Sequence, residues 1–321
     1  MTSKVRLSGV LAAGAMALAL GSAADAGAPQ QKTQAPGYYR MMVGDFEITA
    51  LCDGTFPMNA TELLTHVTPQ QITTDLERSF LKEPVEGSVN GFLVNTGSKL
   101  VLIDTGAGAF FGPSVGKLVA NLKASGYQPS EVDEIYITHM HGDHVGGLLS
   151  DGKIAFPNAT VRAAQQEADY WLSKANLEAA PKEKKESFES AMKALDPYVS
   201  AGKFKPFKGD VELVAGVHAM ATPGHTPGHT AYVVESKGEK LILWGDLMHI
   251  GAVQFPDPGA TIHFDTDSPG AAEQRKRVFA EAARERSWVG GAHVSFPGIG
   301  HLRSSDSGYV FVPANYTSLQ H

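Results

Sequence analysis

The sequence predicts an α/β fold, and three observations lead to that class. Strand-like and helical segments alternate along most of the chain, which is typical of α/β proteins rather than of separate all-α and all-β parts. The 321 residues are 43% hydrophobic and 19% charged, which is enough to bury a sizeable core. Candidate metal ligands or supporting acids follow five of the strand-like segments. Open α/β sheets place their binding sites beyond such strand ends.

The N-terminal segment has the features of a secretory signal peptide. Two positive residues precede an apolar run, Val10 to Leu20, and Ala24-Asp25-Ala26 offers a cleavage site between small residues. The run is shorter than the ~20 residues that a membrane span needs, so an uncleaved anchor is the weaker interpretation. We therefore expect a signal peptide at residues 1–26, a linker at 27–35, one domain at 36–321 and a periplasmic or secreted protein.

Charge and cysteine content exclude several classes of partner. The formal net charge is −7, without long runs of lysine or arginine, and this argues against a nucleic-acid partner. We expect no membrane partner, because no further apolar segment is long enough to span a bilayer. The single cysteine, Cys52, excludes an intrachain disulfide, and we interpret it as a small, partly buried residue.

Strands are predicted from period and turn signals. Residues 46–51 alternate as a half-buried strand does, and Asp53-Gly54 supplies a turn signal after them. Thr96-Gly97-Ser98 joins two apolar runs as a hairpin. The predicted strands occupy residues 46–51, 92–94, 100–103, 135–137, 160–163, 218–222, 229–235, 241–244, 288–292 and 309–312.

Helices are predicted at residues 113–125, 165–174, 182–198 and 271–285. Gly126 ends the first of them. The third carries Phe188, Met192 and Leu195 at helical spacing, and we interpret that stripe as core or lid packing rather than as a cofactor site.

Four metal-competent side chains lie within six residues, directly after the strand at 135–137: His139, His141, Asp143 and His144. Residues i and i+2 of an extended segment point the same way, so His139 and His141 can bind one ion. Gly142 allows a tight turn, after which Asp143 and His144 are better placed for a second ion. Neutral imidazole and carboxylate are ligands that zinc prefers. The alternative interpretation of this segment is a polar loop that is rich in histidine by chance.

Four other strands end in the same kind of residue. Asp104 follows Ile103, and Thr222-Pro223-Gly224-His225 follows an apolar run. Gly245-Asp246 and His293 follow two later strands. Five such ends together predict convergence on a single site.

With these motifs in view, the chain resembles the metallo-β-lactamase superfamily. Residues 139–144, HMHGDH, fit its HxHxDH signature, and TPGHTPGH, GD and AH supply the later ligand motifs in the expected order. A closer likeness to methyl parathion hydrolase and its aryl-lactone-hydrolysing relatives is carried by residues 36–42, 136–141 and 295–301. The resemblance implies an αββα sandwich with the site at the edge of its two sheets, one catalytic domain over 36–321, and a homodimer.

The resemblance also implies a ligand set for two divalent metal ions, with zinc preferred. The first ion would be held by His139, His141 and His225. The second would be held by Asp143, His144 and His293, with Asp246 bridging both ions and accepting or relaying a proton in catalysis. Supporting residues outside the ligand set would be Asp104, His229 and His301. No role in the site is expected for His66, His218, His263 and His321.

The substrate pocket carries over to Leu64, Phe111, Trp171, His249, Ile262 and Phe264. Aromatic walls suit a flat aryl group. The parathion-hydrolysing branch has an aliphatic residue in place of His249 and smaller residues in place of Ile262 and Phe264, and it has a basic residue in place of Leu64. Such a pocket would crowd a tetrahedral thiophosphate more than a planar ester. We therefore predict a hydrolase that opens aryl lactones of the dihydrocoumarin type with a hydroxide bridging the two ions, and that hydrolyses methyl parathion more weakly.

Other functions remain open at this point. Organophosphate hydrolysis could be the main activity, or the substrates could be acyl-homoserine lactones. A glyoxalase II-like thioesterase would need a basic cluster that the sequence lacks, and β-lactam hydrolysis fits the ligand set less well. A mononuclear iron dioxygenase would hold about one iron per chain. Outside enzymes, a periplasmic zinc-binding protein would bind metal without hydrolysing any substrate.

Overall fold

The computed structural model describes Met1 and residues 28–318. The chain divides into two compact units, Met1–Ala35 and Pro36–His321, and the described helices and strands all lie in the second. The predicted signal peptide falls almost wholly on residues outside the described ones, so it stays a prediction, as does export from the cell. Of the helices in the described part of the chain, none has the length and apolarity needed to cross a bilayer.

The first sheet has six strands. Its strands β1, β2, β4 and β5 pair antiparallel, and β5, β6 and β9 pair parallel. In spatial order they are β1 (Tyr38–Val43), β2 (Phe46–Met58), β4 (Val85–Asn95), β5 (Leu100–Ile103), β6 (Glu134–Tyr136) and β9 (Thr160–Arg162).

The second sheet has seven strands, all antiparallel to their neighbours except for the parallel pair β13 and β15. In spatial order they are β10 (Val211–Val214), β11 (Val217–Ala221), β12 (Thr230–Ser236), β13 (Glu239–Leu243), β15 (Trp288–Gly290), β16 (Ile299–Ser305) and β17 (Gly308–Pro313). Two short ribbons are formed by β3 (Leu64–Thr65) with β14 (Thr261–Ile262), and by β7 (Leu149–Ser150) with β8 (Lys153–Ile154).

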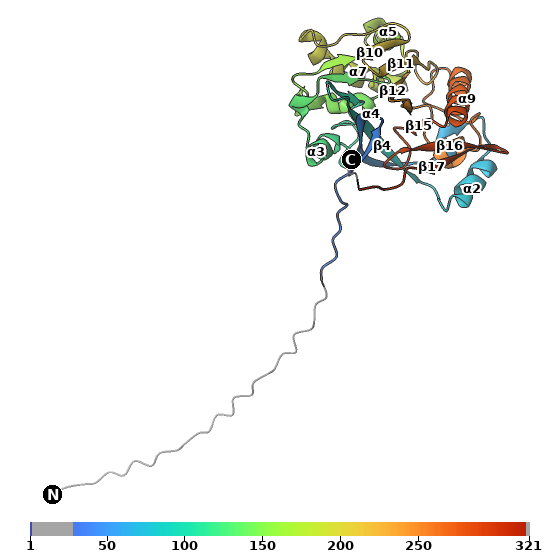
Figure 1. Ribbon diagram of the computed structural model, residues 1–321, viewed down its shortest axis with the longest axis horizontal. Coiled ribbons are helices and arrows are strands. Elements are labelled where there is room, and N and C mark those ends of the chain that lie inside the picture. Colours follow the sequence, from blue (N-terminus) through green and yellow to red (C-terminus); the bar gives the residue numbers. More distant parts are fainter. Residues whose placement is uncertain (2–27, 319–321) are drawn as a thin grey trace. The chain divides into compact units, whose positions relative to one another are not determined.

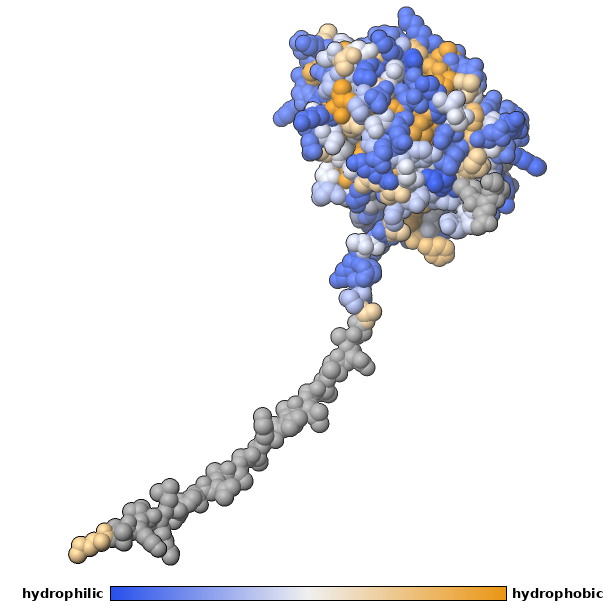
Figure 2. Space-filling model, turned by 60° about the vertical axis from the view of Figure 1, so that its left-hand side comes forward, coloured by the Kyte–Doolittle hydropathy of each residue, from blue (hydrophilic) through white to orange (hydrophobic). Residues whose placement is uncertain are grey.

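The helices of the second unit are α1 (Ala60–Leu63), α2 (Pro69–Arg78), α3 (Leu118–Ala124), α4 (Gly142–Val145), α5 (Gln165–Trp171), α6 (Lys174–Ala179), α7 (Lys182–Ser200), α8 (Gly251–Gln254) and α9 (Ser268–Glu285). Helices α3, α5 and α7 pack on the first sheet and α9 packs on the second, while α1, α2 and α8 pack with one another around β3 and β14. In Figure 1, α3 and α7 lie on the left of the second unit, α5 lies at its top and α9 lies on the right, with strands between them. The face shown in Figure 2 is largely hydrophilic, with hydrophobic residues in a few small patches.

Three hydrophobic layers hold the four structural layers together. Successive side chains of β4 and β5 point to opposite faces of the first sheet. Phe92 and Ile103 therefore face the second sheet, while Leu93 and Leu102 pack against α3 and α7. On the second sheet, Val234 faces inward and neighbouring residues pack on α9. Strands buried on both faces need helices on both sides. The αββα sandwich implied by the resemblance is thereby confirmed.

Two local predictions were wrong. The turn expected at Asp53-Gly54 is a point inside β2, where the pairing with β4 shifts between Cys52 and Gly54 and the strand continues to Met58. A bulge lets a strand absorb an extra residue without ending. The helix expected from residue 113 begins only at Leu118, because the backbone N–H groups of Gly116 and Leu118 donate to the carboxylate of Asp53.

The remaining differences concern segments with weaker sequence signals. The helix predicted at residues 165–174 is divided into α5 and α6. Helix α2 and strands β1, β10 and β16 were not predicted, although β1 and β10 are edge strands of the two sheets and β16 lies between β15 and β17.

Candidate metal centre

The ends of five strands meet where the two sheets come together. Asp104 follows β5 and His139 follows β6 in the first sheet, while Asp246 and His293 follow two strands of the second. His225 lies in the turn between β11 and β12. The convergence expected from the sequence is present, and it joins residues from both halves of the sandwich.

The first cluster consists of His139, His141, His225 and Asp246, whose ligand atoms all lie within 4.8 Å of one another. Nδ1 of His141 lies 3.0 Å from Nε2 of His139 and 3.1 Å from Nε2 of His225. A neutral imidazole ring has only one N–H, so three ring nitrogens that face one another at such distances cannot all be paired by hydrogen bonds. A cation bound by all three would satisfy them better.

The second cluster consists of Asp143, His144 and His293, again within 4.8 Å of one another. Nε2 of His144 lies 3.6 Å from Oδ2 of Asp143 and 3.2 Å from Oδ1 of Asp246. Nε2 of His293 lies 3.5 Å from Oδ2 of Asp143 and 3.2 Å from Oδ2 of Asp246. Asp246 therefore faces both clusters, as the resemblance implied.

The HMHGDH segment reaches both clusters because of its backbone. His141 is extended, with φ −69° and ψ 153°, and it precedes the one-turn helix α4. The tight turn expected at Gly142 is this helical turn, which directs Asp143 and His144 to the second cluster. A Cβ atom at Gly142 would lie 2.9 Å from the ring of Phe111, so a larger residue there would displace this exposed ring.

Asp104 orients His144, in agreement with its predicted supporting role. Its Oδ2 lies 2.8 Å from Nδ1 of His144, and its Oδ1 accepts the backbone N–H of Thr138 at 2.8 Å. Asp104 has φ 58°, a conformation that costs a non-glycine residue of the order of 1–3 kcal/mol. With Nδ1 bonded to Asp104, Nε2 of His144 is the ring atom that faces the cluster and is available to a metal.

Two further orienting groups were missed by the sequence reasoning. Nδ1 of His225 lies 2.8 Å from Oδ1 of Asp265, and Nδ1 of His293 lies 2.8 Å from the carbonyl oxygen of Ser88. Both rings thus have their Nε2 atoms free for a ligand position. Nothing in the sequence near Asp265 or Ser88 distinguishes them from other polar residues.

His229 and His301 differ in their placement. Nε2 of His229 accepts the backbone N–H of Asp246 at 3.0 Å, and its Nδ1 lies 2.8 Å from Oγ1 of Thr222, so this ring supports the loop of Asp246. The supporting role predicted for His301 does not match its position. It packs on Trp288 at the start of β15, and its Nδ1 lies 2.9 Å from the carbonyl oxygen of Ser287.

The buried setting keeps most of the rings neutral. Burial lowers the pKa of His141 to about 3 and that of His229 to about 4, and it places the pKa of His139 and His225 well below the usual range. These neutral rings are in the form that binds metal.

At the second cluster, nearby carboxylates outweigh the lowering of histidine pKa values by burial. Burial alone would lower the pKa of His144, but the charges of Asp246, Asp143 and Asp104 outweigh it and raise that pKa well above the usual range. For Asp246, burial favours the neutral acid, and the neighbouring histidines, His144 first, outweigh it and hold the pKa well below the usual range. Asp246 is therefore an ionised carboxylate surrounded by histidine side chains.

Unpaired atoms test whether the residues fit a metal. Nε2 of His144 and Oδ1 of Asp246 are buried and lie 3.2 Å apart, but neither atom has a well-formed hydrogen bond. Leaving such a group unpaired costs about 1–3 kcal/mol, and a divalent cation would satisfy both. Together with the imidazole and carboxylate donor set, this supports divalent metal ions at the site.

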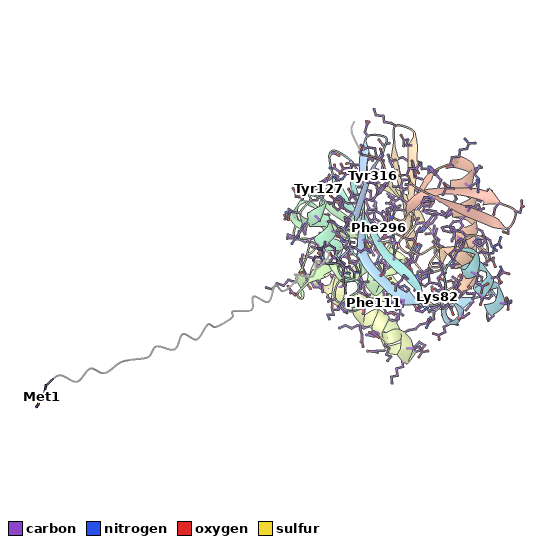
Figure 3. All side chains as sticks on the ribbon, turned by 90° about the horizontal axis from the view of Figure 1, so that it is seen from below. Met1, Lys82, Phe111, Tyr127, Phe296 and Tyr316 are labelled. Carbon is purple, nitrogen blue, oxygen red and sulfur yellow. The ribbon has the colours of Figure 1, made fainter. Side chains whose placement is uncertain are left out.

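A cavity of about 350 Å³ opens over the two clusters. Its wall is mainly apolar, and Phe111 and Phe264 are 53% and 44% exposed at its mouth. Figure 3 labels Phe111, whose loop lies on the same side of the unit as α7. Besides cluster residues, the wall is formed by Phe56, Met58, Phe111, Gly142, Trp171, Glu183, Lys184, Ser187, His249, His263, Phe264 and Thr266.

Two predicted pocket residues do not line the cavity. Leu64 and Ile262 pair across β3 and β14, and both side chains pack in a hydrophobic cluster with Ile250 and Val253. His263, for which no role was expected, follows Ile262 and lies in the wall. Residues further along β2 were missed because the predicted strand ended too early.

His249 lines the cavity, as predicted, and also contacts the site. Its Nε2 lies 3.1 Å from Oδ2 of Asp246, and its ring stacks on that of His293 with centroids 5.2 Å apart. Its Nδ1 is buried and has no partner. The rings of His225 and His293 are each fixed through Nδ1, so His249 lacks the support that is typical of a metal ligand.

Comparisons with known proteins agree with this geometry. A sequence profile described as the Metallo-beta-lactamase superfamily matches residues 84–293. An N-acyl homoserine lactonase of Bacillus cereus is 32% identical over 129 residues, which cover 40% of this chain and 42% of that enzyme. The match thus spans about two-fifths of the length of these curated relatives.

Two solved structures are similar over most of the chain. The hydrolase AbOPH, described as a member of the beta lactamase superfamily, is 40% identical with a TM-score of 0.85, covering 89% of this chain and 100% of its own. AidC, described as a dizinc quorum-quenching lactonase in complex with an N-acylated homoserine product, is 27% identical with a TM-score of 0.82, covering 88% of this chain and 99% of its own.

The pKa shifts predict how the metal-free chain responds to acid. Rings such as those of His139, His141 and His225 take up protons in the unfolded chain below about pH 6.5 but stay neutral in the folded one. Their contribution to stability is therefore lost as the pH falls. His144 and His293, whose pKa values are raised, act in the opposite sense.

The four lowered rings, His229 included, outnumber the two raised rings and Glu167, whose pKa is also raised. The free energy of unfolding should therefore fall between pH 7 and 5, by about 1.4 kcal/mol per pH unit for each net proton. Urea unfolding of chelator-treated protein at several pH values measures this slope. A stability that rises on acidification would contradict it.

Proposed function

Given that this chain belongs to the metallo-beta-lactamase superfamily, we propose that it is a metal-dependent hydrolase that opens aryl lactones of the dihydrocoumarin type. The observation that supports this substrate class is the cavity, in which aromatic side chains surround the two clusters. Planar aromatic esters bury well against aromatic walls. Weaker hydrolysis of organophosphate triesters such as methyl parathion is part of the proposal.

The cofactors in this proposal are two divalent ions, with zinc preferred. The first cluster would hold one and the second cluster the other, with Asp246 shared between them. The description of AidC as a dizinc lactonase supports both the number and the element. When bound, such ions supply Lewis acidity toward the lactone carbonyl and lower the pKa of water toward neutrality.

The residues of the chain supply the rest of the chemistry. Ring opening adds one water across the acyl C–O bond, and the ring oxygen leaves with a proton to give a hydroxy acid. Asp246, an anion in the fold, accepts the proton of the attacking water and passes it to the leaving oxygen. Phe111, Trp171 and Phe264 hold the aryl ring and exclude bulk water.

A second candidate function is hydrolysis of acyl-homoserine lactones. The names of the Bacillus cereus relative and of AidC support it, because both are described as lactonases of this kind. The same two clusters would serve this reaction, with the acyl chain in place of the aryl ring.

We also propose that the protein is a homodimer, and this proposal rests on the family resemblance alone.

The substrate proposal predicts a ratio of specificity constants. For purified protein loaded with zinc, kcat/KM should be greater for dihydrocoumarin than for methyl parathion, because a planar ester fits between the aromatic walls more easily than a tetrahedral triester. N-hexanoyl homoserine lactone in the same assay separates the two lactone classes. A ratio in favour of the phosphotriester would make organophosphate hydrolysis the main activity.

The position of His249 predicts a change of substrate preference. His249→Leu removes a polar ring from the cavity wall and should shift the ratio toward methyl parathion by about 10- to 100-fold. His218→Leu, on β11 outside the cavity wall, is the matched control and should leave the ratio unchanged. If His249→Leu also leaves it unchanged, the pocket does not determine this preference.

The proton-transfer role of Asp246 predicts a loss of turnover. With zinc in excess, Asp246→Asn should lower kcat by about 10²- to 10⁴-fold, since the amide cannot accept the proton. Metal content is measured on the same samples, and Asp306→Asn, at an exposed position between β16 and β17, serves as the control. A variant with both ions and full turnover would remove Asp246 from this role.

A further inference from the structure

Glu167 is a buried carboxylate that the proposed chemistry does not use. It lies in the first turn of α5 and is fully buried. Burial raises its pKa to about 7, so its charged form depends on nearby hydrogen-bond donors. Such a group is costly in a protein interior unless its oxygen atoms are paired.

Both oxygen atoms of Glu167 are paired, and their partners lie on different loops. Oε1 accepts the backbone N–H of Met140 at 2.9 Å. Oε2 accepts the hydroxyl of Thr226 and the backbone N–H of Gly228, each at 2.8 Å. Hydrogen bonds to a carboxylate are stronger than neutral ones, so these contacts fix the two loops firmly.

These partners are sequence neighbours of the first cluster. Met140 lies between His139 and His141, and Thr226 directly follows His225. One loop follows β6 of the first sheet, and the other connects β11 and β12 of the second. Glu167 therefore connects the backbones that carry all three histidines of the first cluster.

The surroundings of Glu167 agree with a close fit. A Cβ atom at Gly228 would lie 2.4 Å from the backbone nitrogen of Glu167, so only glycine allows this approach. One turn further along α5, the ring of Trp171 contacts that of His141 in a T-shaped arrangement, with centroids 5.2 Å apart. The anchoring of α5 through Glu167 thus also fixes a wall of the cavity.

We propose that Glu167 is a positioning residue that sets the separation between the His139–His141 loop and the His225 loop, and thereby the metal affinity of the first cluster. It touches neither substrate nor metal and acts through the backbone. The inference rests on the proposed function only in requiring that the first cluster binds a divalent ion, and it is independent of the substrate.

Glu167→Gln tests the proposal with little change of shape. Glutamine has one acceptor oxygen, so its NH₂ group must face either Met140 N–H or the donors at Thr226 and Gly228. One loop then moves. The zinc dissociation constant of one of the two sites should rise about 10- to 100-fold, while the other changes little.

Zinc affinity is measured by competition with a chromophoric chelator, and the Co²⁺ d–d absorption spectrum reports the ligand geometry. Thr226→Val removes one donor and should shift zinc affinity in the same direction by a smaller factor. It decides the question if Glu167→Gln does not fold. Asp169→Asn, exposed on the same helix, is the control and should bind zinc as the unaltered protein does.

The outcomes separate the two proposals. If Glu167→Gln and Thr226→Val bind two zinc ions with unaltered affinity and an unaltered Co²⁺ spectrum, Glu167 is not a positioning residue. A lower melting temperature of the metal-free protein with unaltered zinc affinity would likewise overturn the inference, since it indicates a purely structural role. If the unaltered protein binds no divalent ion, the metal centre itself is wrong.

Discussion

The site depends on one buried negative charge, that of Asp246. Its carboxylate oxygens lie between 3.1 and 3.6 Å from ring nitrogens of five histidines. Because the interior disfavours an isolated ion, this anion persists only through its neighbours, and the rings in turn gain a counter-charge. His229 and the turn after β13 hold the aspartate in place from behind. The proposed metal binding and the proposed proton transfer both depend on this arrangement.

The clustering of the predicted ligand residues could be expected from the sequence because most of them follow a strand closely. The direction of a strand fixes where the next side chain goes, as for His139 after β6 and Asp246 after β13. The groups that orient the rings could not be found in this way. Asp265 reaches His225 across 40 residues, and Ser88 uses a carbonyl oxygen, which every residue has. Their roles arise only when the two sheets pack together.

The residues that form the wall of the cavity could be predicted only in part. Phe111 and Trp171 line it as expected, whereas the pairing of β3 with β14 turns Leu64 away. Phe56 reaches the cavity because the bulge in β2 lets that strand run past Gly54. Both outcomes depend on strand register, which short apolar segments do not determine. The fold class, by contrast, needs only the alternation of strands and helices.

The first cluster draws its ligands from both halves of the sandwich, with His139 after a strand of one sheet and His225 after a strand of the other. A bound ion would therefore cross-link the two halves of the sandwich. By mass action, whatever binds the native chain alone raises its resistance to unfolding as the logarithm of the free concentration. The melting temperature of the whole molecule would then rise and fall with the supply of metal around it.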